Sequence, residues 1–228
     1  MMRKKTSEDQ HQACTACKCI YKETNVFYNR YFKKGSKKDP GFQILYGPPF
    51  FETPILFIGY QPGKGCKTAK EERKYGSENR WPKKSEFATE CWPLAVNLRN
   101  MFGGKLIENC VGTNAIFVRS NSISDYHKNL DKTLRKKIQE FCLCHIARMV
   151  KAIQPKLIVA LGFATLELFD KNTERYKIGT KKRVLVRKGK ICGQEAIGVL
   201  HLSGARISMR DRKTIARCIK SRARVSKG

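Results

Sequence analysis

The sequence predicts an α/β fold, a three-layer α/β/α sandwich around a four-stranded, mainly parallel sheet. Two observations predict it. Four short segments are apolar throughout, as strands buried on both faces of a parallel sheet are. Segments with helical spacing of apolar residues alternate with them. At 228 residues the chain can bury one sizeable core.

We divide the chain into a Cys-bearing N-terminal extension, residues 1–50, and an α/β domain, residues 51–228. The extension is polar and is interrupted by Gly35, Asp39-Pro40-Gly41 and Gly47-Pro48-Pro49. We interpret this segment as an extension wrapped on the main domain.

The first half of the domain contains two expected strands and one expected helix. Residues 54–59 form an apolar run that stops in a Gly/Pro-rich loop, as a buried strand does. A helix is expected near 86–102, ending at Gly103-Gly104. The second strand is expected near 112–118.

The middle of the domain follows the same order. Apolar residues recur three and four positions apart over 131–153, which predicts a helix that Pro155 ends. The apolar run 157–161 is the third expected strand, and Gly162 turns the chain into a short helix, 163–170.

The last part of the chain is basic. A hairpin-like segment, 183–195, leads into the fourth expected strand, 196–201. A final helix is expected over 211–223, where apolar residues alternate with Lys and Arg. This pattern favours one helix face on the core and the other toward phosphates.

The charge indicates a polyanionic partner. Lys and Arg number 47 against 19 Asp and Glu, a net charge of +28. Nucleic acid is the leading candidate, because neutralising phosphates releases counterions; the alternative is a solvated basic surface. No apolar run is long enough to span a membrane, and the start lacks a signal-peptide core. We therefore expect a protein of the cytoplasm (the nucleus in a eukaryote) that binds nucleic acid and no membrane.

Three expected strand ends carry side chains suited to chemistry. They are Gly59-Tyr60-Gln61-Pro62-Gly63, Asn114 and His201-Leu202-Ser203. The carboxyl ends of parallel strands meet at one edge of the sheet, where α/β proteins bind ligands. We expect these side chains to share one site.

These segments resemble motifs of the uracil-DNA glycosylase superfamily, in order and spacing, over roughly residues 50 to 220. Its first motif has the form Gly-x-Asp/Asn/Glu-Pro-x, its second strand carries a base-reading Asn, and its fourth strand ends in His-Pro-Ser. Residues 153–164, Ile-Gln-Pro-Lys-Leu-Ile-Val-Ala-Leu-Gly-Phe-Ala, are similar to a segment of the iron–sulfur and related branches.

The resemblance implies a monofunctional DNA glycosylase that binds single- or double-stranded DNA, and we expect it to be a monomer. It would flip out uracil or a modified pyrimidine and hydrolyse the N-glycosidic bond, leaving an abasic site, in DNA repair or in defence against phage DNA with hypermodified cytosine. His201 would stabilise the leaving base, Asn114 would read it and Gln61 would place the water.

The chain departs from the family pattern at the catalytic loop. Gln61 stands where an Asp would activate water, and a carboxamide can only orient it, as the Asn of the mismatch-specific and single-strand-selective branches does. Leu202 replaces the Pro of the His-Pro-Ser motif. The alternative is therefore a non-catalytic DNA-binding module on the same fold.

Further residues are candidates for the base pocket and for DNA contacts. The candidates for base binding are Tyr60, Trp81 and Phe87, and those for DNA contact are Lys64, Arg119, Ser203, Arg206 and Arg210. Trp81 could instead pack in the core, and Lys64 and Arg119 could be solvated.

The ten cysteines include two closely spaced groups, Cys14-x-x-Cys17-x-Cys19 and Cys142-x-Cys144. Thiolates at such spacing are typical of metal sites. The resemblance implies a [4Fe-4S] cluster on Cys14, Cys17, Cys19 and Cys142, with Cys144 as an alternative ligand; zinc or ordinary reduced thiols are the other options. The chemistry requires neither metal.

Overall fold

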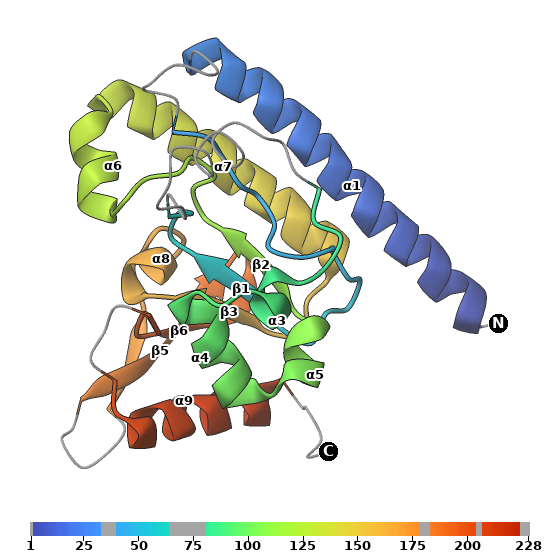
Figure 1. Ribbon diagram of the computed structural model, residues 1–228, viewed down its shortest axis with the longest axis vertical. Coiled ribbons are helices and arrows are strands. Elements are labelled where there is room, and N and C mark those ends of the chain that lie inside the picture. Colours follow the sequence, from blue (N-terminus) through green and yellow to red (C-terminus); the bar gives the residue numbers. More distant parts are fainter. Residues whose placement is uncertain (1, 33–39, 64–80, 178–182, 204–206, 224–228) are drawn as a thin grey trace.

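The structure, a computed structural model, contains one six-stranded sheet in the order β2-β1-β3-β6-β5-β4 (Figure 1). The model describes residues 2–32, 40–63, 81–177, 183–203 and 207–223. The strands are β1 (Leu56–Gly59), β2 (Val111–Asn114), β3 (Ile158–Leu161), β4 (Glu174–Lys177), β5 (Val184–Ile191) and β6 (Gln194–Val199).

Parts of the four expected strands form the parallel region of this sheet, β2-β1-β3-β6. The second strand is shorter than expected over 112–118, because β2 ends at Asn114 and residues 115–118 lie outside it. The expectation of only four strands is wrong, because β5 and β4 add two antiparallel strands beside β6. β5 lies in the expected hairpin-like segment 183–195, whereas β4 was missed. Both strands carry exposed basic residues, Lys190 in β5 and Arg175 in β4, so neither is a continuous apolar run. An antiparallel strand with one solvated face alternates instead.

Helices cover both faces of the sheet (Figure 1). Alternate β1 side chains enter two separate cores: Leu56 and Ile58 join the one beneath α1 and α7, and Phe57 joins the one beneath α4 and α9. The helices are α1 (Met2–Tyr31), α3 (Glu86–Thr89), α4 (Pro93–Phe102), α5 (Gly104–Glu108), α6 (Ile123–Asn129), α7 (Lys132–Ile153), α8 (Phe163–Glu167) and α9 (Met209–Arg222).

The expected helix over 86–102 is broken into α3 and α4. Trp92 is extended, with ψ 153°, and Pro93 is the first residue of α4. Proline favours this position because it lacks an N–H to donate and disfavours helical backbone in the residue before it. The expected helix over 131–153 is confirmed as α7. Asp131 caps its start, and Gln154 ends it in a left-handed conformation, just before Pro155.

Most of the N-terminal extension is one long helix, α1, which was not predicted from the sequence. One face of it is buried, at positions 13, 17, 20, 21, 24 and 28. That face packs on α7, where Phe27 stacks on Phe141 with ring centroids 4.0 Å apart. Helical spacing of the buried residues was the signal that could have predicted this helix.

A charged cluster joins α1 to α7. Glu23 accepts hydrogen bonds from His145 Nε2 at 2.8 Å and from Arg148 Nη2 at 2.9 Å. The bond from Arg148, more than that from His145, lowers the pKa of Glu23 from 4.5 to about 2. The carboxylate therefore stabilises the folded state fully above pH 4.5, and this contribution is lost as the pH falls toward 2.

Replacing Glu23 by Gln is expected to lower the free energy of unfolding at neutral pH by about 1 kcal/mol, because the cluster is partly exposed. The variant should also lose less stability than the parent between pH 4.5 and 2. Urea unfolding across this pH range measures both effects. Equal stability of the two proteins at neutral pH would contradict the prediction.

Candidate active site

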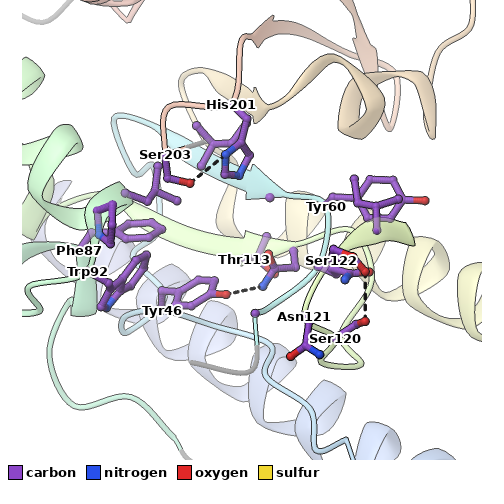
Figure 2. A pocket seen from close by; sticks show the side chains of 18 residues that line it. Tyr46, Tyr60, Phe87, Trp92, Thr113, Ser120, Asn121, Ser122, His201 and Ser203 are labelled. Atoms are coloured by element: carbon purple, nitrogen blue, oxygen red, sulfur yellow. Dashed lines mark hydrogen bonds between the residues drawn. The ribbon is translucent and has the colours of Figure 1, made fainter. Parts of the chain in front are cut away.

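The carboxyl ends of the parallel strands border a pocket of about 420 Å³. Gln61 follows β1, Asn114 ends β2 and His201 follows β6, and all three line this pocket. In Figure 2 His201 and Ser203 lie on one side of the pocket and Tyr46 lies on the other. The structure thus brings together the three residues that the strand ends predicted.

Asn114 lies at the floor of the pocket and is 2% exposed. Its Nδ2 donates a hydrogen bond to Tyr46 Oη at 2.9 Å (Figure 2). Burial raises the pKa of Tyr46 to about 12, so the hydroxyl keeps its proton. On the other side Gly59 pairs with Asn114 in the sheet, and a Cβ at Gly59 would lie 2.5 Å from Asn114 Oδ1. Glycine therefore leaves room for the Asn114 amide.

The two polar atoms of the Gln61 side chain are buried, although the residue as a whole is partly exposed. Neither Nε2 nor Oε1 has a hydrogen-bond partner in the described part of the chain. An unsatisfied buried amide costs about 1–3 kcal/mol, so such groups normally hold water or a ligand. Because Gln61 lines the pocket, its free amide is suited to bind a water or a ligand there.

His201 is hydrogen-bonded through one ring nitrogen. Its Nδ1 lies 3.0 Å from Ser203 Oγ (Figure 2). The residue is exposed overall, but the surrounding pocket desolvates the imidazole and lowers the pKa of His201. The ring is therefore neutral at neutral pH. If the Ser203 hydroxyl donates to Nδ1, the ring hydrogen lies on Nε2 and can be donated. Ser203, expected to contact DNA, is thus also the partner of His201.

Three aromatic side chains form one end of the pocket, which we call the aromatic wall (Figure 2). Phe87, an expected base-binding residue, is 1% exposed and stacks on Tyr46 with centroids 5.2 Å apart. The Trp92 ring centroid lies 5.5 Å from that of Phe87 and 5.6 Å from that of Tyr46. Sequence reasoning missed Tyr46 and Trp92, which no motif marks. Trp81 lies elsewhere: it packs edge-on against Tyr21 and does not line the pocket.

The opposite end of the pocket is polar, with Tyr60 and the segment 120–122 (Figure 2). Tyr60 Oη lies 3.5 Å from His127 Nε2 on α6, and burial raises the pKa of Tyr60. Ser120 Oγ donates to the Ser122 carbonyl at 3.1 Å. Sequence reasoning missed the segment 120–122, because serine and asparagine after a strand are ordinary loop residues.

The expected DNA-contacting cations differ in their surroundings. Arg119 donates a hydrogen bond to the Gly63 carbonyl at 2.7 Å, so its side chain lies against the loop that carries Gln61. Arg210 is exposed in the first turn of α9. Lys64 and Arg206 lie outside the described residues.

The cysteines of the two motifs differ in their burial. Cys17 and Cys142 are buried, and burial raises the pKa of each thiol to about 12. The Cys142 sulfur accepts a hydrogen bond from Phe117 N at 3.4 Å. Cys19 and Cys144 are exposed. Among the described residues, no three Cys, His, Asp or Glu side chains form a group that could hold a metal.

No protein-family model matches this chain, and no curated protein matches its sequence. Within the described ranges, none of the helices has the length and apolar character needed to cross a membrane.

Proposed function

We propose that this protein is a DNA glycosylase that flips a pyrimidine out of DNA and hydrolyses its N-glycosidic bond. The observation that carries the proposal is the meeting of Gln61, Asn114 and His201 in one pocket beside an aromatic wall. An amide for base recognition, an amide for water and a hydrogen-bond donor for the leaving base are the groups that this reaction needs.

His201 would act on the leaving base. Breaking the N-glycosidic bond produces an oxocarbenium-like sugar and places negative charge on the departing pyrimidine, at O2. A neutral imidazole that donates from Nε2 to this oxygen stabilises the transition state more than the ground state. The bond between Nδ1 and Ser203 supports this orientation of the ring.

Asn114 and the aromatic wall would recognise the base. One amide offers both a donor and an acceptor, which match the polar edge of a pyrimidine. Tyr46 and Trp92 offer ring faces against which a flipped base can stack. The volume of about 420 Å³ and the polar end formed by residues 120–122 leave room for a substituent on the base, so uracil and modified cytosines are both candidate substrates.

DNA is the proposed polymer because the chain is strongly basic. Its net charge is +28, and α9 exposes Arg210, Lys213 and Arg217. Cations along one helix favour the phosphate backbone without reading sequence.

A substrate screen tests the proposal. The full chain is incubated with single- and double-stranded DNA that contains uracil, a mismatched pyrimidine or a modified cytosine, and abasic sites are revealed by alkaline cleavage. We expect abasic sites in at least one DNA. Tight binding without cleavage of any of them would instead indicate the non-catalytic DNA-binding module.

Replacing Gln61 by Ala is expected to lower the excision rate about fivefold, because one neutral hydrogen bond to water contributes about 1 kcal/mol. Replacing Gln61 by Glu is expected to raise the rate as the pH rises through the new carboxyl pKa, because a carboxylate can accept the proton of the water. Single-turnover assays across pH measure both effects. A pH-independent Glu variant with the parent's rate would exclude a water site at Gln61.

A further inference from the structure

The segment after β2 forms backbone hydrogen bonds with residues 59–63, the loop that carries Gln61. Three consecutive contacts use backbone groups of both segments. They are Ala115 N to Gly59 O, Ile116 N to Tyr60 O and Ser120 N to Pro62 O, at 2.8, 2.9 and 3.1 Å. The loop is thus held at its beginning and near its end by one neighbouring segment.

The Arg119 side chain completes this series at the far end of the loop. Its Nη1 donates to the Gly63 carbonyl at 2.7 Å, and its Nη2 donates to Gln43 Oε1. Gln43 Nε2 in turn donates to both carboxylate oxygens of Glu86, each at 3.1 Å. The Gln43 amide therefore lies between a carboxylate and a guanidinium, and its bonds to both are charge-assisted.

This network joins separate parts of the pocket. Glu86 precedes Phe87 of the aromatic wall, Gln43 belongs to the N-terminal extension, and Gly63 lies two residues after Gln61. Within the described residues, the Gln61 side chain forms no hydrogen bond that could fix its position. Its position depends on the backbone that carries it, and hence on the bonds of that backbone.

We propose that Arg119 is a positioning residue, whose guanidinium holds the Gly59–Gly63 loop and so sets the place of the Gln61 amide in the pocket. This inference rests on the proposed glycosylase function. It differs from the sequence-based expectation of a phosphate contact, because both terminal nitrogens of Arg119 donate to acceptors of the protein itself.

Replacing Arg119 by Ala is expected to lower the single-turnover excision rate at saturating DNA about 10²-fold, as displaced catalytic groups do. The Kd for DNA and its salt dependence should stay unchanged. Arg119→Lys should also be slow, because an ammonium keeps the charge but cannot reproduce the planar fork that spans two acceptors. Gln43→Ala should be slow as well, and combining it with Arg119→Ala should add little.

The matched control is Arg175→Ala, an exposed Arg on the edge strand β4, which should leave the rate and the Kd unchanged. A phosphate contact predicts a different pattern: weaker binding, a salt slope reduced by about one, and an unchanged rate at saturation. The proposal would be overturned by that pattern, by full activity of Arg119→Ala, or by a parental excision rate in Arg119→Lys.

Hydrogen exchange separates this inference from the proposed function. In Arg119→Ala the amides of Ala115, Ile116 and Ser120 should exchange faster, because they donate to the released loop, while β3 keeps its protection. If the parent protein cleaves no DNA, the proposed function fails, and hydrogen exchange still tests whether Arg119 holds the loop. Unchanged exchange of these three amides would overturn the role of Arg119, and a loss of protection in β3 as well would indicate general destabilisation instead.

Discussion

Replacing His201 by Ala is expected to slow base excision about 10²–10³-fold, the usual cost of removing one donor to a developing oxyanion. His201 lines the pocket, and its bond to Ser203 leaves Nε2 available to the base. The DNA Kd should stay close to that of the parent, because the donor acts on charge that develops only in the transition state. Single-turnover rates and equilibrium binding, measured on the same DNA, separate the two quantities.

The control for this variant is His11→Ala, which removes an exposed histidine on α1 and should change neither quantity. Excision by His201→Ala at the parental rate would show that another group stabilises the leaving base. The pH dependence gives a second check. Because desolvation lowers the pKa of His201, protonation of the imidazole, and the loss of rate that follows from it, should occur at a lower pH than the titration of a free histidine.

Replacing Gly59 by Ala is expected to reduce excision about 10²-fold by displacing the Asn114 amide. The new Cβ would lie 2.5 Å from Asn114 Oδ1, closer than carbon and oxygen can approach. Asn114 has little room to retreat, because it is 2% exposed and its Nδ2 is bonded to Tyr46. The overpacking should also lower the free energy of unfolding by about 1–3 kcal/mol.

Gly104→Ala is the matched control for the glycine variant. Gly104 begins α5, and a Cβ there would meet nothing within 4 Å. Alanine in a helix is neutral or slightly stabilising, so the control should keep its activity and stability. Base excision and urea unfolding measure both variants. A Gly59→Ala protein that excises the base at the parental rate would show that Asn114 does not read it.

The parallel part of the fold was predictable because strands buried on both faces must be apolar throughout. β1 and β3 satisfy this rule, and the helix over 131–153 follows from its apolar spacing. β2 and β6 satisfy it only in part, because β2 ends in Thr113-Asn114 and β6 begins with Gln194-Glu195. β5 was expected only as part of a hairpin-like segment, and β4 was missed, because the same rule excludes strands with charged side chains. The helix α1 was missed because its buried positions lie among many polar residues, although their spacing is helical.

The sequence by itself determined where Gln61, Asn114 and His201 would meet, because parallel strands in one sheet end at the same edge. Only the tertiary structure decided what surrounds them. Tyr46 lies 68 residues before the Asn114 that it bonds, and Gln43 lies 76 residues before Arg119. No local pattern encodes such pairs, since each depends on how the N-terminal segment packs against β2. A strand end marks a site, but packing between distant segments determines how its side chains are held.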